Sequence, residues 1–162
     1  MNAIVIMGVS GCGKTTVGRA LAERLRATFL DADDFHPAAN VEKMRAGTPL
    51  NDEDRTPWLA TLNRELRERS QHDEPIVLAC SALKLRYREA IGAELPQLDW
   101  IFLDGSFEVI AERMRARANH YMPESLLRSQ FEALERPEDA ICISIDLSAA
   151  EQVEAALSAL AI

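Results

Sequence analysis

Short apolar runs alternate with amphipathic segments along the whole chain. The runs are brief and flanked by polar or turn residues, which is typical of buried strands. They cover residues 3–7, 28–31, 76–79, 100–103 and 141–145. Strands that alternate with helices favour a parallel sheet covered on both faces. The pattern therefore predicts an α/β fold with a five-stranded parallel sheet and helices on both sides.

Amphipathic helices are predicted between these strands. Apolar residues recur at every fourth position from Val17 to Leu25 and again from Trp58 to Leu66, which places each set on one helix face. Ser148 is expected to cap the last helix. The helices predicted by range are 14–26, 83–93, 107–116 and 149–160. In the remaining polar and turn-rich stretches we expect a substrate-side insertion at about 32–57 and a lid at about 113–125.

Composition and charge narrow the class of protein. The chain has 162 residues, enough for one domain and too few for two. Eighteen Lys and Arg against 26 Asp and Glu give a net charge of −8. A negative field repels polyanions, so we expect no nucleic-acid partner.

Membrane and disulfide signals are not found in the sequence. No apolar run approaches the roughly 18 to 20 residues that span a bilayer, and no signal-peptide pattern precedes the first strand. We therefore expect a cytoplasmic protein without a membrane partner. The three cysteines are odd in number and widely spaced, which predicts neither a disulfide framework nor a zinc site.

A glycine-rich motif joins the first predicted strand to the first predicted helix. Residues 8–15 read G-V-S-G-C-G-K-T, a complete phosphate-binding loop, or P-loop, of the form G-x-x-x-x-G-K-[ST]. Glycines let the backbone approach phosphate oxygens, at the positive end of the helix dipole. Lys14 is expected to reach the β and γ phosphates and Thr15 to ligate Mg²⁺. The predicted nucleotide-binding residues are Gly8, Val9, Ser10, Gly11, Cys12, Gly13, Lys14, Thr15 and Thr16.

Charged side chains follow the second predicted strand. Residues 31–37 read D-A-D-D-F-H-P, and the carboxyl edge of a parallel sheet is where ligands bind. Asp33 could orient or deprotonate an acceptor hydroxyl, hold the metal through water, or serve only as a cap or turn residue. His36 could line a ligand pocket or serve a structural role. A P-loop alone does not separate a kinase from a nucleotide-dependent switch.

Five stretches together resemble the gluconokinase family of P-loop carbohydrate kinases. They read G-V-S-G-x-G-K at 8–14, F-L-D-x-D-x-x-H-P at 29–37, G-x-P-L-N-D-x-D-R-x-P-W at 47–58, C-S-A-L-K-x-x-Y-R at 80–88 and S-Q-F-E-x-L-E at 129–135. The resemblance implies phosphorylation of D-gluconate by ATP at its C6 hydroxyl. It also implies a homodimer and a fold similar to nucleoside monophosphate and shikimate kinases. Ala32 departs from the glycine that members often have there.

Further residues are expected to serve the reaction. Asp33, His36, Arg55 and Lys84 are predicted to line the sugar-acid pocket, although Arg55 could instead pair with Asp52 or Asp54. Lys14, Asp33 and Arg117 are the predicted catalytic residues.

Two arginines are predicted to act from the lid. Arg113 and Arg117 lie four residues apart and so share a helix face. They are expected to clamp phosphate when the lid closes. The alternative is a solvated stripe paired with Glu108 and Glu112.

The residues alone are also compatible with two other functions. One is another small-molecule kinase of this architecture, acting on shikimate or a nucleoside monophosphate. The other is a nucleotide-dependent switch or binding module, although the chain has no N-K-x-D guanine signature.

Overall fold

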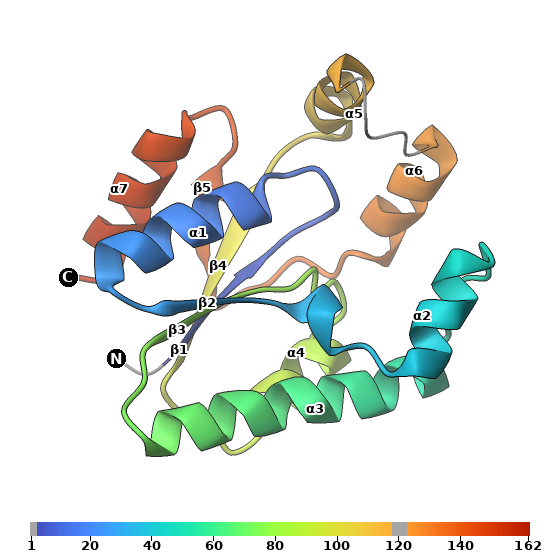
Figure 1. The fold of residues 1–162 in the computed structure, drawn as a ribbon. Helices are drawn as coiled ribbons and strands as arrows, with labels where there is room; N and C mark the ends of the chain where they lie inside the picture. Colours follow the sequence, from blue (N-terminus) through green and yellow to red (C-terminus); the bar gives the residue numbers. More distant parts are fainter. Residues whose placement is uncertain (1–2, 118–122) are drawn as a thin grey trace.

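The computed structural model describes residues 3–117 and 123–162, and the helices and strands in this part surround one central sheet (Figure 1). The sheet has the strand order β2-β3-β1-β4-β5, and every pair of neighbours is parallel. The strands are β1 (Ala3–Met7), β2 (Thr28–Asp31), β3 (Ile76–Ala79), β4 (Leu98–Asp104) and β5 (Ile141–Ser144). The predicted five-stranded parallel sheet is therefore confirmed.

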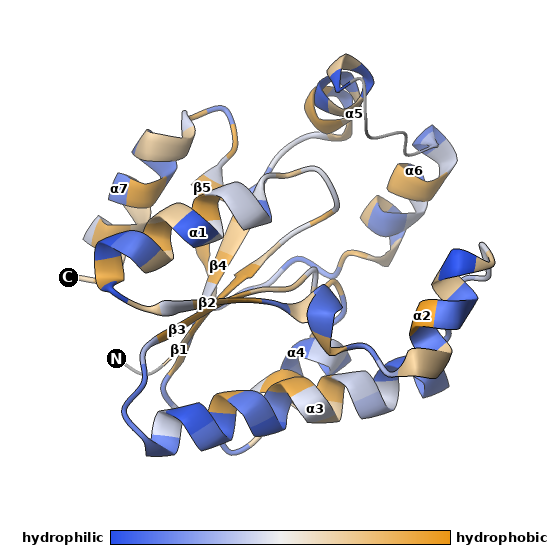
Figure 2. Cartoon of the chain, in the orientation of Figure 1, coloured by the Kyte–Doolittle hydropathy of each residue, from blue (hydrophilic) through white to orange (hydrophobic). Residues whose placement is uncertain are grey.

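Four helices cover the two faces of the sheet. α1 (Lys14–Leu25) and α7 (Ala149–Ala159) lie on one face, and α3 (Asp52–Gln71) and α4 (Leu85–Gly92) lie on the other (Figure 1). Alternate residues of β1 point to opposite faces: Ile4 joins the core under α1 and α7, and Val5 joins the core over α3 and α4. Apolar colour gathers on the strands and polar colour on the outer side of α3 (Figure 2). Burial on both faces explains why the inner strands β1 and β3 read as continuous apolar runs.

Side-chain caps fix where two of these helices begin. Asn51 accepts from the backbone of Asp54, whose carboxylate accepts from the backbone of Asn51, so α3 starts with a capping box. Ser148 and Glu151 form a second capping box at α7, as predicted for Ser148. Such reciprocal bonds satisfy backbone N–H groups that have no partner inside the helix.

Three further helices and a 3-10 turn lie near the carboxyl ends of the strands. They are η1 (Ala32–Phe35), α2 (Ala38–Arg45), α5 (Phe107–Ala116) and α6 (Glu124–Ala133). Of these the sequence predicted only α5. In α2 a single residue, Asn40, is buried, so this helix has no apolar stripe on which a sequence prediction could depend. α6 does have such a stripe, because Leu127 is buried and Phe131 and Leu134 pack against the core, and the sequence prediction missed it.

Element boundaries differ from the predicted ones by a few residues. α3 begins at Asp52, so Pro57 lies inside the helix. α4 begins at Leu85 rather than at residue 83, because Lys84 has an extended backbone (φ −101°, ψ 144°) and occupies the N-cap position. Among the described residues no helix is both long and apolar enough to cross a membrane.

Candidate active site

The P-loop lies between the carboxyl end of β1 and α1. Gly8 has φ 149°, and a Cβ there would lie 2.7 Å from Cys12 Sγ. Gly13 caps α1 in a left-handed conformation, and no acidic residue occupies the first turn of this helix. The positive end of the helix dipole therefore faces the loop without a competing carboxylate, which suits a phosphate group.

Lys14 is folded back over this loop. Its Nζ donates to the carbonyl oxygens of Gly8 (3.0 Å) and Val9 (3.1 Å). Both acceptors are neutral carbonyls, so a phosphate oxygen would replace either of them with a stronger, charge-assisted bond. The neighbouring Thr15 and Thr16 are exposed at the start of α1.

Gln130 of α6 binds the P-loop directly, which the sequence did not predict. Its Oε1 accepts from the backbone N–H of Ser10 (2.7 Å), and its Nε2 donates to Ser10 Oγ (2.9 Å). The two residues are 120 positions apart, and the only sequence signal was the position of Gln130 within the S-Q-F-E-x-L-E stretch. These two bonds connect the helix that follows the expected lid to the nucleotide loop.

The acidic residues after β2 stand beside the P-loop. Asp31 Oδ1 accepts from the backbone N–H of Asp33 (3.0 Å) and so shapes the η1 turn. Desolvation raises the pKa of Asp33 and the carboxylate of Asp31 adds to this rise, whereas His36 and Lys14 lower it. The charge of Lys14 thus reaches Asp33, and a carboxylate with a raised pKa accepts a proton more readily than an ordinary aspartate does.

His36 lies against the start of the long helix α3. Its ring stacks on Trp58, with centroids 4.2 Å apart and planes 15° apart. Trp58 is itself fixed, because its Nε1 donates to the carbonyl of Ala32 (2.7 Å). The structure thus brings Asp33 and His36 to one side of the P-loop.

Arg55 and Lys84 meet around Tyr87. Arg55 Nη1 lies 3.4 Å from the Tyr87 hydroxyl and 3.8 Å from Asp52 Oδ1, and Lys84 Nζ lies 5.9 Å from the centre of the Tyr87 ring. The Tyr87 hydroxyl donates to Asp52 (2.6 Å), a bond that lowers the pKa of Asp52, with Arg86, Lys84 and Arg55 also lowering it. Arg55 therefore keeps only a long contact with Asp52, and Asp54 pairs with Lys43 instead (2.8 Å).

Arg88 holds the loop that carries Lys84. This buried guanidinium donates to the carbonyls of Ala82 (2.7 Å), Leu83 (3.1 Å) and Glu135 (2.8 Å). The segment after α6 is thereby tied to the loop after β3. Arg88 was visible in the sequence only as the last residue of the C-S-A-L-K-x-x-Y-R stretch.

Arg113 and Arg117, which were expected to clamp phosphate, differ in their contacts. Arg113 donates to the carbonyl of Ile145 (2.6 Å), although its charge still acts on Cys12 of the P-loop. Arg117 caps the end of α5 and is exposed. The expected lid continues through residues 118–122, which lie outside the described residues. Neither arginine has an acidic hydrogen-bond partner among the described residues, so the stripe paired with Glu108 and Glu112 is not observed there.

The thiols near the site are not activated. Burial raises the pKa of Cys12 despite the opposing charge of Lys14, and burial raises the pKa of Cys80 to about 12. A thiol with a raised pKa is a poor nucleophile. Cys12 is therefore a packing residue of the loop.

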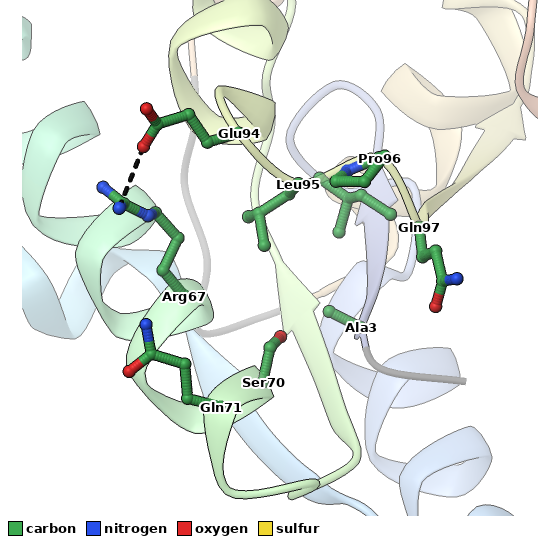
Figure 3. A pocket seen from close by; sticks show the side chains of 9 residues that line it. Ala3, Arg67, Ser70, Gln71, Glu94, Leu95, Pro96 and Gln97 are labelled. Atoms are coloured by element: carbon green, nitrogen blue, oxygen red, sulfur yellow. Dashed lines mark ion pairs between the residues drawn. The ribbon is translucent and has the colours of Figure 1, made fainter.

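A separate hollow lies at the opposite edge of the sheet. It is lined by the end of α3 and by the residues before β4, with Arg67 and Glu94 paired across it at 2.9 Å (Figure 3). Ala3 and Leu98, which line it, begin their strands. Because ligands of parallel sheets bind at the carboxyl ends of strands, this hollow is not the candidate active site.

Known proteins share both the sequence and this arrangement. The shikimate kinase family model matches residues 10–159. The thermosensitive gluconokinase of Escherichia coli (strain K12) is 47% identical over 137 residues, covering 85% of this chain and 73% of that protein. The crystal structure of a gluconokinase from Sinorhizobium meliloti 1021 has a TM-score of 0.89 and 44% identity, covering 99% of this chain and 91% of that one. Shikimate kinase from Aquifex aeolicus, at 21% identity and TM-score 0.63, covers 98% of this chain and 96% of that one and shares the P-loop NTPase fold.

Proposed function

This chain belongs to the gluconokinase family of P-loop kinases, and from that premise we propose that it transfers the γ-phosphoryl group of ATP to the C6 hydroxyl of D-gluconate. The observation that carries the proposal is that the P-loop after β1 and Asp33 after β2 lie at the same carboxyl edge of the sheet. The charge of Lys14 acts on this carboxylate. Phosphoryl transfer requires the acceptor hydroxyl to be held next to the γ-phosphate, in line for attack.

The P-loop and Lys14 bind the triphosphate in this mechanism. Backbone N–H groups at the start of α1 point at the phosphates, and Lys14 exchanges its bonds to Gly8 and Val9 for bonds to phosphate oxygens. The lysine is held over the loop before nucleotide arrives, so little reorganisation is needed. Its charge then balances the charge that develops on the transferred group.

Magnesium fits the chemistry of this site. Among the described residues no group of three or more His, Cys, Asp or Glu side chains could hold a metal. Mg²⁺ is commonly bound by one or two protein oxygens together with phosphates and water, and the exposed hydroxyl of Thr15 offers such an oxygen. When bound, the ion neutralises phosphate charge and orients the triphosphate.

Asp33 orients the attacking hydroxyl. Its carboxylate accepts the hydroxyl hydrogen and directs an oxygen lone pair at the γ-phosphate. His36, Arg55 and Lys84 surround the rest of the sugar acid, and the two cations suit its carboxylate. The Tyr87 ring and hydroxyl hold these cations in place.

The lid completes the site in this proposal. We assign residues 1–162 to a single kinase domain, in which residues 32–57 cover the acceptor and residues 113–125 close over the nucleotide. Arg117, at the end of α5, and Arg113 supply charge to the phosphates on closure, which also excludes water. We further propose that the enzyme is cytoplasmic, as expected from its sequence, and that it forms a homodimer, as the family resemblance favours.

An acceptor screen tests the proposed function. Purified protein with ATP and Mg²⁺ is offered D-gluconate, shikimate and nucleoside monophosphates in turn, and ADP release is followed. We expect turnover with D-gluconate well above ATP hydrolysis alone. Faster turnover with shikimate or a monophosphate would identify another kinase, and tight nucleotide binding without acceptor-stimulated turnover would identify a switch.

A further inference from the structure

Asn40 is a buried polar residue in the part of the chain that covers the acceptor side. Asn40 is 3% exposed and lies on the short helix α2. Its Nδ2 donates to the backbone carbonyl of Asp54 (2.8 Å). A carbonyl oxygen can only accept, so this bond identifies which side-chain atom of Asn40 is the nitrogen.

The same nitrogen of Asn40 faces the ring of His36. Nδ2 lies 3.2 Å from His36 Nδ1. An amide nitrogen carries two hydrogens and accepts no hydrogen bond, so Nδ1 must be the acceptor and carries no proton. The proton of a neutral His36 ring is therefore on Nε2.

The ring of His36 is held in this orientation from a second side. Trp58 stacks on one face at 4.2 Å, and the Trp58 indole is fixed by its bond to Ala32. Within the described residues Nε2 of His36 has no hydrogen-bond partner. The Nε2–H group is thus a free donor, and the charge of Asp33 acts on the His36 ring.

Charge supports the neutral form of the ring. Desolvation lowers the pKa of His36 and Arg55 lowers it further, while Asp33 opposes them. A proton on Nδ1 would also point at the hydrogens of Asn40 Nδ2, which is repulsive. Both effects keep His36 neutral near pH 7.

We propose that Asn40 is a positioning residue that fixes His36 as its Nε2–H tautomer, so that His36 donates a hydrogen bond to the sugar acid. A hydroxyl of the acceptor then donates to Asp33, while an oxygen of the acceptor accepts a hydrogen bond from His36 Nε2–H. This inference rests on the proposed function for the identity of the acceptor. The tautomer itself is a property of the free protein.

Nitrogen NMR of labelled histidine tests the tautomer without any assay of activity. The chain has three histidines, and the spectrum of His36→Gln assigns the His36 signals. We expect a bare Nδ1 and a protonated Nε2 in the wild type, and a protonated Nδ1 in Asn40→Asp, whose carboxylate accepts where the amide donated. A protonated Nδ1 in the wild type, or an unchanged spectrum in Asn40→Asp, would overturn the proposal.

A matched control separates this role from simple packing. Asn63 on α3 also donates from Nδ2 to two acceptors, the carbonyls of Ile91 and Ala93, both at 2.8 Å. We expect Asn40→Ala to raise the KM for D-gluconate about threefold to tenfold, the effect of roughly one hydrogen bond, with the KM for ATP unchanged. Asn63→Ala is expected to change neither KM, and an equal change in both variants would indicate packing alone.

Two substitutions of His36 test the donor itself and do not depend on how Asn40 variants fold. The amide nitrogen of Gln reaches the place of Nε2, whereas that of Asn reaches the place of Nδ1. We expect His36→Gln to keep the KM for D-gluconate within about threefold and His36→Asn to raise it about tenfold, since only the latter loses a hydrogen bond. Equal values would refute the donor role, and absence of turnover in the wild type would refute the proposed function while the NMR result still stood.

Discussion

Asp33 combines a role in the reaction with a cost to folding. Its carboxylate is desolvated beside Asp31, which raises its pKa. The folded chain therefore binds a proton at this residue at higher pH than the unfolded chain does. The contribution of Asp33 to stability is therefore fully present below the ordinary pKa of aspartate and is lost as pH rises through the raised pKa, so the ionised form needed for catalysis is the one that folding disfavours.

Replacing Asp33 by Asn is predicted to move activity and stability in opposite directions. We expect kcat to fall by roughly 10² or more and the midpoint of thermal unfolding at pH 7 to rise. Steady-state kinetics and calorimetry measure the two changes. Asp34→Asn, one residue along the same turn, is the control and should alter kcat little; an unchanged kcat in Asp33→Asn would reduce Asp33 to a structural role.

Arg88 is predicted to contribute to stability rather than to chemistry. It is 8% exposed and donates to three backbone carbonyls. Arg88→Met leaves these acceptors without the guanidinium and should lower the free energy of unfolding by about 1 to 3 kcal/mol. Arg67→Met removes only the ion pair with Glu94, between side chains that are largely exposed, and should cost less than about 1 kcal/mol in the same denaturant titration. Equal losses would contradict this account.

Individual site residues differed in how far the sequence could reveal them. Lys14 and Asp33 could be predicted, because each belongs to a short motif or follows a strand. Asn40, Gln130 and Arg88 could not be assigned roles, because each also has a partner far away in the chain, at 14, 120 and 47 residues respectively. No local spacing encodes such contacts.

At the scale of elements, α6 connects the lid to the nucleotide loop. Gln130→Ala removes both bonds to Ser10, so the loop loses a restraint that holds it ready for phosphate. We expect the KM for ATP to rise about tenfold, since about 1.4 kcal/mol of lost binding energy has that effect.

The control for this prediction lies on the same helix. Ser129→Ala removes an exposed side chain whose one hydrogen bond within residues 3–117 and 123–162 is to the carbonyl of Leu126, and it should leave the KM for ATP unchanged. An unchanged or lower KM for ATP in Gln130→Ala would mean that Gln130 competes with phosphate for Ser10 rather than preparing the loop.

The elements that the sequence predicted are those with an apolar face toward the sheet. All five strands and helices α1, α4 and α7 were predicted within a few residues, because burial imposes the helical spacing of α1 and the continuous run of β1. α3 was predicted from Trp58 to Leu66 and extends six residues further at its start and five at its end.

α6 was missed although Leu127, Phe131 and Leu134 recur along it at helical spacing and pack against the core. α2 was missed because polar contacts at the site hold it in place. For α2 these contacts are the polar bonds of Asn40 and Lys43 to Asp54.

At the scale of the whole molecule, the strand order explains why the site lies where it does. β1 is central, with β3 on one side and β4 on the other. The loops after β1, β2 and β3 therefore meet at one edge, where α2, α5 and α6 surround them (Figure 1). The hollow at the opposite edge contains none of the predicted site residues.

The most direct measurement of the central claim is the phosphorus NMR spectrum of a reaction of this protein with ATP, Mg²⁺ and D-gluconate. The account predicts that the γ-phosphate signal of ATP is replaced by a phosphomonoester whose phosphorus couples to the two protons of a terminal methylene group. Accumulation of inorganic phosphate alone, or a phosphomonoester coupled to a single proton, would contradict it.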